Sequence, residues 1–423
     1  MRKFGIATFA LVLTVVLGFS TLYAQRTVVI WEPEGYGLEA VKGLVEGLSG
    51  VKLDIHEFSY GDLRSKLQTT LLARDPKVAP DIVMIDSIWL GEFVEGGYLA
   101  DLTDVVAPIA KTWFKAFREG SQWPPSSGRY YGLWYDTDVR ATFYWPDLLK
   151  KAGVNPGDLL YWDTFIKACQ KLKTELSDEG IGACWLDMAG SWAPDFEFFP
   201  YLWQEGGEIL VKKNGKFYPA FNSEAGVKAL KFLVDRVKSG IDPQTETFWG
   251  NDFAKKKWAV YPHGNWASSE SRFPGTTPDE REKMIAVLPL PVSEPGKVPV
   301  TLAGGWIMSI PAIIKDKAPE RFEAAAKVMK TFLRADVMTK YYAALARVPV
   351  RSDVDKKELS KSIEFFDFYM KMASVARTRP AIPQWSQVSD AIFQAMSDAV
   401  FKGMDPKVAL DRAAEKVKRI LGW

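Results

Sequence analysis

Thr27-Val-Val-Ile-Trp31 is a short, almost continuous apolar run, and Asp81-Ile-Val-Met-Ile85 is a second one. Runs of this kind are typical of parallel strands that are buried on both faces. Between them, residues 51–56 alternate apolar and polar side chains, which indicates a half-exposed strand. Helical stretches, from about 37 to 48 and from about 62 to 73, separate the three strands. This βαβα order predicts an open parallel α/β sheet.

The residues that follow each strand are candidates for a binding site, because ligands of open α/β sheets bind beyond the carboxyl ends of the strands. The first strand ends in Trp31-Glu32, the second leads to Ser59-Tyr60, and the third ends in Asp86-Ser87. These positions supply hydroxyl groups, carboxylates and aromatic rings. They supply no Lys or Arg, which a phosphorylated ligand would need.

The composition is that of a soluble globular protein with room for two domains. The chain has 423 residues, of which 47% are hydrophobic. Lys and Arg number 54 against 52 Asp and Glu, so no charge excess points to nucleic acid or to an anionic membrane surface. The 16 Trp, 15 Tyr and 25 Phe suit a protein that stacks its ligand on flat apolar rings.

The N-terminus reads as a secretory signal peptide. Arg2 and Lys3 precede an apolar stretch from Phe4 to Phe19, and small residues follow up to Ala24. We expect cleavage near Ala24 and export to the periplasm; a retained membrane anchor is the alternative. No cysteine lies near the cleavage point, so lipid attachment there is not expected.

Few residues in the chain suggest catalysis or metal binding. The two cysteines, Cys169 and Cys184, lie where a helix is followed by a strand, and they are either a disulfide or two buried thiols. The two histidines, His56 and His263, lack further ligands at metal spacing. We find no phosphate-binding loop, nucleophile elbow or zinc pattern. The sequence therefore predicts no catalytic residue, no metal and no cofactor.

Several segments, taken in order, resemble one family. Residues 80–102 contain Pro-Asp-Ile-Val-Met-Ile-Asp and then Phe-Val-Glu-Gly-Gly-Tyr-Leu, and residues 128–153 run from Gly-Arg-Tyr-Tyr-Gly to Leu-Leu-Lys-Lys-Ala-Gly. Residues 285–312 carry Leu-Pro-Leu-Pro and Gly-Gly-Trp, and a fourth matching segment starts at Pro380. Together they resemble the extracellular solute-binding proteins of sugar-type ABC importers, the family of maltose-binding protein.

The resemblance implies an α/β fold of two lobes, each an open, mostly parallel sheet flanked by helices, joined by hinge crossovers. Lobe one is expected at 26–138 plus 303–346, and lobe two at 139–302 plus 347–423. The implied partners are the membrane permease subunits of an ABC importer, with no nucleic acid, and the implied state is a monomer. The sequence departs from the family around Tyr144-Trp145 and around His263.

A sugar presents hydroxyl groups at its edge and C–H groups on its faces, so its site needs charged or amide hydrogen-bond partners and aromatic rings. We expect rings to line the cleft at Trp31, Trp266 and Trp306, the last two by resemblance. Glu32, Asp86 and, by resemblance, Asp138 are expected to accept from hydroxyls, and Arg347 to donate. Tyr60 and Gly304 complete the predicted set, and the looser candidates are Trp89, Trp185, Asp187, Trp192 and Trp385. For Trp31, packing in the core is an equal alternative.

The predicted function is capture of a mono- or oligosaccharide and its delivery to the importer by hinge closure. On the same scaffold the alternatives are a polyol, a polyamine or a phosphorylated polyol. From another class, the alternative is a secreted glycoside hydrolase, which needs two carboxylates about 5–9 Å apart.

Overall fold

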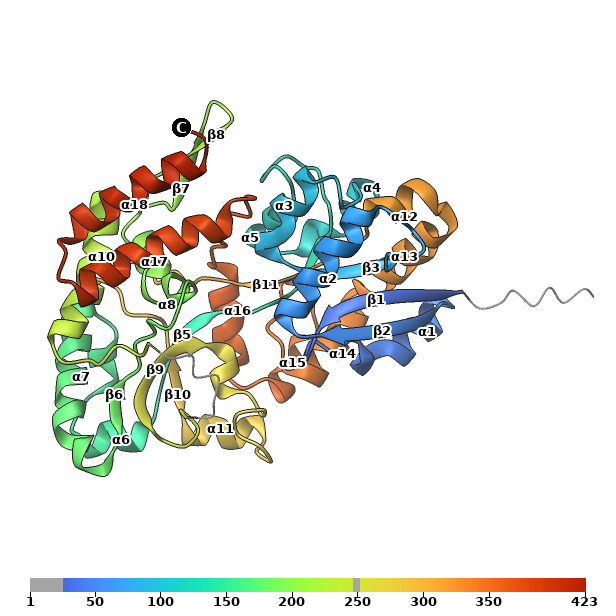
Figure 1. Cartoon of the computed structure of the whole chain (residues 1–423). Helices are drawn as coiled ribbons and strands as arrows, with labels where there is room; N and C mark the ends of the chain where they lie inside the picture. Colours follow the sequence, from blue (N-terminus) through green and yellow to red (C-terminus); the bar gives the residue numbers. More distant parts are fainter. Residues whose placement is uncertain (1–25, 246–251) are drawn as a thin grey trace, which may run out of the picture.

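The chain folds into two α/β lobes that lie side by side (Figure 1). The structure is a computed structural model that describes residues 26–245 and 252–423. The predicted signal peptide, residues 1–24, lies outside the described residues. Each lobe is built around one sheet with helices packed against it, as predicted.

The sheet of lobe one has the strand order β2-β1-β3-β11-β4. β2 and β3 run parallel to β1, whereas β11 is antiparallel to β3 and β4. Because β11 is antiparallel to both of its neighbours, β4 runs in the same direction as β1, β2 and β3, so the sheet is mostly parallel, as predicted, with β11 as its one antiparallel strand. The chain leaves the lobe at the end of β4 and re-enters beside it in the opposite direction, since Thr137 pairs with Gly305. The bounds are β1 (Thr27–Pro33), β2 (Lys52–Phe58), β3 (Ile82–Asp86), β4 (Leu133–Thr137) and β11 (Gly305–Ser309).

The predicted helices of lobe one are present and begin close to their expected residues. The first is a 3-10 turn, η1 (Leu38–Val41), followed by α1 (Lys42–Ser49). The second, α2 (Tyr60–Ala73), starts at Tyr60 because the Ser59 side chain accepts the Asp62 amide as a cap. The remaining helices of this lobe are α3 (Leu90–Glu95), α4 (Thr103–Val106), α5 (Lys115–Gly120), α12 (Ala312–Lys317), α13 (Pro319–Phe332) and α14 (Ala335–Leu345).

The sheet of lobe two has the order β10-β5-β9-β6. β6 pairs parallel with β9, whereas β5 is antiparallel to both β9 and β10. β6, β9 and β10 therefore run in one direction and β5 in the other, so this sheet is also mostly parallel, as predicted. β5 enters the lobe from one crossover and β10 leads back toward the other, so the two run in opposite directions. The bounds are β5 (Arg140–Tyr144), β6 (Gly182–Cys184), β9 (Trp258–Gly264) and β10 (Ala286–Leu288).

Amphipathic helices cover lobe two. Ser223 caps α10 and Asp405 caps α18, each by accepting backbone amides of the first turn. Cys169 of α7 and Cys184 of β6 form a disulfide, which decides between the two alternatives left by the sequence. The helices are α6 (Pro146–Lys151), α7 (Trp162–Leu176), α8 (Ala193–Glu197), α9 (Phe199–Gln204), α10 (Glu224–Lys238), α11 (Pro278–Met284), α17 (Trp385–Phe401) and α18 (Pro406–Ile420), with a hairpin of β7 (Leu210–Lys213) and β8 (Lys216–Pro219).

Two crossovers between the sheets lie against each other. The amide of Arg140 donates to the Thr301 hydroxyl at 2.7 Å, and that hydroxyl donates to the Arg140 carbonyl at 2.8 Å. The Thr137 hydroxyl donates to the Gly304 carbonyl at 2.8 Å. The chain later returns through α15 (Lys356–Ser362) and α16 (Phe366–Ser374). In the described residues we find no helix that is long and apolar enough to cross a membrane.

Candidate functional site: a cleft between the lobes

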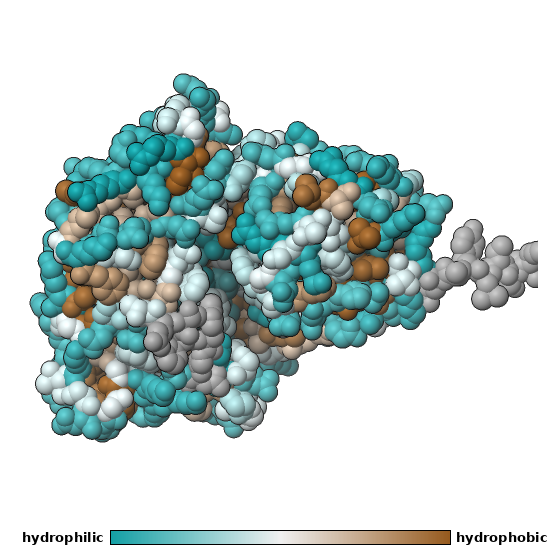
Figure 2. Space-filling model, viewed as in Figure 1, coloured by the Kyte–Doolittle hydropathy of each residue, from teal (hydrophilic) through white to brown (hydrophobic). Residues whose placement is uncertain are grey.

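A cavity of about 1050 Å³, which we name the main cleft, lies between the lobes. Lobe one contributes the turn at 34–36 and residues 343–346 at the end of α14, and Arg347, the next residue, continues this wall. The other wall comes from the crossover at Asp138, from residues 192–196 and from residues 265–272. Figure 2 shows the surface hollowed between the lobes.

At the crossover, Asp138 forms an ion pair with Arg140, in which the arginine is buried and the Asp138 side chain is 23% exposed. The Asp138 carboxylate also accepts the Gly304 amide at 3.0 Å. A Cβ at Gly304 would lie 2.9 Å from the same carboxylate, so the close approach requires glycine. The Arg140 guanidinium lies 4.5 Å from the Phe196 ring centroid and 5.0 Å from that of Trp266. Three predicted residues are thus brought together, around an arginine that the sequence analysis missed.

The lobe-one wall is built on Tyr36 and Arg347. The Arg347 guanidinium lies 4.2 Å from the Tyr36 ring centroid, and its Nη2 donates to the Gly35 carbonyl at 2.6 Å. Its Nε is 3.5 Å from the buried Asp136 carboxylate. Burial raises the pKa of Asp136 to about 6, although the charge of Arg347 opposes that rise. Trp306 is buried behind this wall, 5.2 Å from the Tyr36 ring.

The guanidinium of Arg379 contacts carboxylates from both lobes. Its Nη1 donates to Asp195 of α8 at 2.8 Å, and its Nη2 lies 3.7 Å from Asp86 at the end of β3. The Tyr60 hydroxyl donates to Asp86 at 3.0 Å. The structure therefore places the predicted Tyr60 and Asp86 in one interaction chain that ends in lobe two.

Of the predicted residues, Asp138, Trp266 and Arg347 line the main cleft, whereas Tyr60, Asp86, Gly304 and Trp306 do not, nor do Trp31 and Glu32 of β1. The two residues of β1 are held by contacts inside lobe one. Trp31 packs against Phe58, with 5.3 Å between ring centroids. Glu32 is 0% exposed, and its carboxylate accepts the Leu38 amide at 3.2 and 3.3 Å, which holds the start of η1. Burial raises the pKa of Glu32 to about 8. Neither residue is among those that line the main cleft.

The less specific candidates of the sequence analysis also divide into one residue that lines the main cleft and four that pack elsewhere. Trp192 lines the main cleft. Trp89 packs in lobe one, 5.9 Å from Trp306, and Trp385 packs against Phe199 in lobe two. The remaining two belong to the interior of lobe two: Trp185 is 3% exposed, and Asp187 accepts the Ala189 amide at 3.0 Å.

His263 is buried beneath the aromatic wall of lobe two. Its ring stacks on Tyr261 at 4.7 Å and on Phe196 at 5.1 Å, and it meets Trp266 edge to face at 5.2 Å. Burial, together with the charges of Arg140 and Arg272, lowers its pKa to about 3. His263 is therefore a neutral packing element under Trp266.

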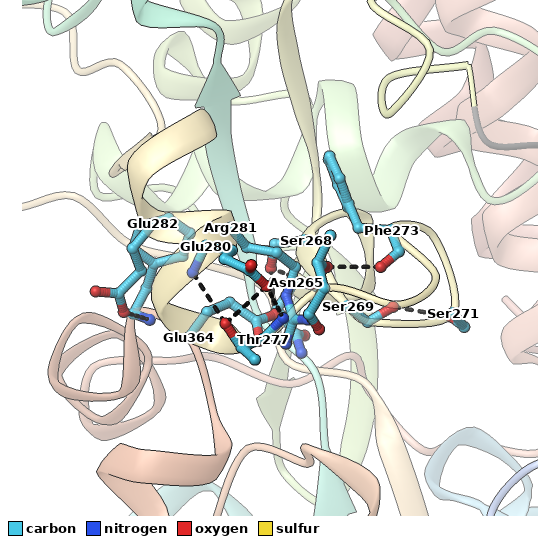
Figure 3. A network of polar contacts seen from close by, with 12 residues as sticks. Asn265, Ser268, Ser269, Ser271, Phe273, Thr277, Glu280, Arg281, Glu282 and Glu364 are labelled. Atoms are coloured by element: carbon cyan, nitrogen blue, oxygen red, sulfur yellow. Dashed lines mark hydrogen bonds and ion pairs between the residues drawn. The ribbon is translucent and has the colours of Figure 1, made fainter.

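A buried polar network holds the turn that carries Trp266 (Figure 3). Glu364, which lies between α15 and α16, accepts from Ser268 at 2.7 Å and from Arg281 at 2.7 Å. Arg281 of α11 also donates to the Thr276 carbonyl at 2.6 Å. Because Arg281 and Glu364 are each 2% exposed, water competes little for these bonds. The network fixes the turn next to the cleft from behind.

Taken together, the main cleft offers rings and paired charges. Asp138 faces Arg140, Asp195 faces Arg379, and Arg347 faces Asp136. The other charged residues of the lining include two acids and two bases, so the charges largely cancel: Glu34, Glu270, Arg272 and Lys361. Within the described ranges, no group of three or more His, Cys, Asp or Glu side chains is placed to hold a metal ion. The sequence analysis missed Tyr36, Arg140, Asp195 and Arg379, because their grouping depends on segments far apart in the chain.

Comparison with known proteins gives the same fold. Among curated relatives, the chain is 26% identical to the arabinooligosaccharide-binding protein of Bacillus subtilis, covering 87% of this chain and 85% of that protein. It is 23% identical to the diacetylchitobiose binding protein of Streptomyces coelicolor, covering 91% and 87%.

Solved structures agree in fold. The GacH receptor of Streptomyces glaucescens aligns with a TM-score of 0.75 at 22% identity, covering 94% of this chain and 98% of that one. Maltose-bound MalE3 of T. maritima aligns with a TM-score of 0.75 at 22% identity, covering 93% and 100%. These proteins share the two-lobed architecture. The model of the bacterial extracellular solute-binding protein family matches residues 37–339, and the chain belongs to this family.

Proposed function

We propose that this protein captures a neutral carbohydrate, a mono- or oligosaccharide, and delivers it to the permease subunits of an ABC importer by hinge closure. One observation supports the proposal above the others: the main cleft combines aromatic rings with carboxylate–arginine pairs. A charge-compensated pair still offers lone pairs and N–H groups to hydroxyls, but it attracts no net charge. A neutral ligand rich in hydroxyl groups satisfies such a site best.

The names of relatives support the same class of ligand. The curated relatives include an arabinooligosaccharide-binding, a lactose-binding and a diacetylchitobiose binding protein. A structural neighbour from Agrobacterium radiobacter is a complex with ribitol, so a polyol is the nearest alternative. A polyol has the hydroxyl groups of a sugar but no ring face to stack, and Tyr36, Trp192 and Trp266 favour the sugar.

Charged ligands fit the main cleft less well. A polyamine needs acids without partners, yet Asp138 and Asp195 are each paired with an arginine. A phosphorylated polyol needs free basic groups, yet Arg140, Arg347 and Arg379 each face a carboxylate. Either charged ligand would have to compete with the partner that each of these groups already has.

The pairing of these acids with arginines also argues against glycoside hydrolysis. We propose that the protein binds its ligand without catalysing a reaction. A general acid must hold a proton and a general base must be free to take one. Asp138 and Asp195, the acids nearest the crossover, are both held as partners of guanidiniums.

We further propose that the chain is exported, with cleavage near Ala24 and no lipid anchor, and that it acts as a periplasmic monomer. The basic and apolar N-terminal sequence supports export. The proposed lobes are residues 26–138 plus 303–346 and residues 139–302 plus 347–423, because the crossovers described above lie at these junctions.

The test is a thermal-shift screen of the mature protein after refolding from denaturant, which strips any ligand carried from the host. The panel contains monosaccharides, neutral oligosaccharides, ribitol, polyamines and glycerol phosphates. A ligand that binds only the native state raises the Tm by mass action. We expect shifts with neutral sugars. A shift with polyamines or phosphates alone would overturn the proposed ligand class, and sugar hydrolysis by the purified protein would overturn the proposed lack of turnover.

A further inference from the structure

A second cavity, of about 550 Å³, also lies between the lobes. Lobe one lines it with Ser87, with residues of α5 and with Gln122. Lobe two lines it with Trp203 and residues 208–210, and the segment 374–381 completes it. Its volume is in the range of known ligand pockets, about 300–1,000 Å³. We name it the second cavity.

Arg379 lies on the boundary between the two cavities. It lines the second cavity, while its hydrogen-bond partner Asp195 lines the main cleft. Its other carboxylate, Asp86, directly precedes Ser87 of the second cavity. A Cβ built at Gly304, beside Asp138 of the main cleft, would lie 3.4 Å from Nη2 of Arg379. The guanidinium therefore separates the space near Asp138 from the space near Ser87.

The position of this guanidinium is strongly fixed. Asp86 is 9% exposed and Asp195 is 4% exposed, and the guanidinium of Arg379 lies beside both carboxylates. Asp86 also accepts from the Tyr60 hydroxyl, so Asp195 depends more strongly on the arginine. Moving the arginine aside would take the hydrogen-bonded guanidinium away from the buried Asp195, which costs several kcal/mol. A ligand in the main cleft meets Arg379 as a fixed wall.

The Nε–H group of the same side chain is a donor without an acceptor. Among the described residues, Nε of Arg379 is buried and has no hydrogen-bond partner. A buried donor without an acceptor costs about 1–3 kcal/mol, so a ligand oxygen placed there gains affinity. Sugar hydroxyls and ring oxygens are acceptors of the required kind.

We infer that Arg379 determines the length of the carbohydrate that binds: its guanidinium ends the main cleft, and its Nε donates to the sugar unit at that end. Longer chains are excluded because the continuation into the second cavity is closed by the Asp86–Arg379–Asp195 bridge. This inference rests on the proposed function and specifies its ligand.

The test uses calorimetric titration with a series of neutral oligosaccharides of increasing length. The main variant combines Arg379→Met with Asp195→Asn, so that neither member of the close pair is left alone. Arg379→Lys is the second variant, because it keeps the charge and removes the Nε donor. The matched control combines Arg351→Met with Asp353→Asn, an ion pair that lines neither cavity.

For the double variant we expect a loss of about tenfold in affinity for the sugars that the wild type prefers, with a gain of similar size for longer ones relative to them. Arg379→Lys is expected to lose affinity without a change in preferred length, and the control to keep the wild-type profile. A double variant whose affinities change by one common factor at all lengths would refute the inference alone. A wild-type protein that binds no carbohydrate would refute the proposed function as well.

Discussion

At the scale of single residues, the main cleft depends on aromatic rings whose faces carry guanidinium groups. Arg140 lies over Trp266, and Arg347 lies over Tyr36. A cation on one face of a ring leaves the other face and the edge for a ligand, and it also fixes the ring. These two rings come from opposite lobes, so both contribute to any ligand that bridges the lobes.

Trp266→Ala is expected to weaken binding of the identified ligand about tenfold, because it removes a stacking surface worth about 1–2 kcal/mol. Trp423→Ala is the control, since Trp423 is 42% exposed near the C-terminus and does not line the main cleft. Calorimetric titration measures both. Equal affinities for the two variants would contradict the assignment of Trp266 to the ligand site.

Glu32 makes stability depend on pH. Its pKa is raised from 4.5 to about 8 by burial, so the folded protein holds a proton that the unfolded chain releases between these values. The stabilising contribution is therefore complete below about pH 4.5 and is lost as the pH rises toward 8.

Glu32→Gln keeps an acceptor for the Leu38 amide and removes the titrating group. We expect the free energy of unfolding of this variant to fall less than that of the wild type between pH 5 and pH 8, as measured by urea titration. Glu95→Gln, at an exposed position, is expected to follow the wild type. An unchanged pH slope in Glu32→Gln would show that the buried carboxyl does not titrate in this range.

At the scale of elements, the wall that carries Trp266 is held by a helix and a loop from different parts of the chain. Arg281 of α11 and Glu364 before α16 form the buried pair behind it (Figure 3). The sequence predicted neither partner, because the two residues are more than eighty positions apart and each reads as an ordinary surface charge. Only packing made them a pair.

Glu364→Gln is expected to cost about 3 kcal/mol of stability, since it leaves the Arg281 charge buried without a counter-ion. It is also expected to weaken ligand binding, because Ser268 loses its carboxylate acceptor next to Trp266. Asp81→Asn breaks a comparable pair with Arg321 in lobe one, away from the main cleft. Urea unfolding and titration of the folded protein should show lower stability in both variants but lower affinity only in Glu364→Gln.

At the scale of the whole molecule, the two lobes meet where α3 faces the segment before α17. Gly91 of α3 lies so close to this segment that a Cβ there would be 1.9 Å from the Ala381 carbonyl oxygen. The rings of Trp123 would be 2.9 Å away. Ala381 belongs to the proposed lobe two, so the distance from Gly91 to this backbone increases when the lobes open. A side chain at position 91 is therefore expected to disfavour the closed arrangement.

Gly91→Ala is expected to weaken ligand binding by tenfold or more, because alanine favours the helix but is incompatible with the closed arrangement. Gly47→Ala in α1 is the matched control, since a Cβ there meets nothing within 4 Å. Titration and small-angle scattering with ligand should show a more open Gly91→Ala protein. Wild-type affinity in this variant would mean that the lobes do not need this contact.

The sequence by itself predicted the fold class, the order of strands and helices from residue 27 to residue 86, and Asp138, Trp266 and Arg347 as residues of the candidate site. Apolar runs and helix caps are local signals, and the resemblance covered the crossovers. Tertiary structure alone decided that Glu32 holds the start of η1, that each sheet contains one antiparallel strand, and that Arg140, Arg347 and Arg379 pair with acids at and behind the cleft. The physical reason is that burial and ion pairing depend on which distant segments meet, and two lobes brought together by crossovers make most of those meetings non-local.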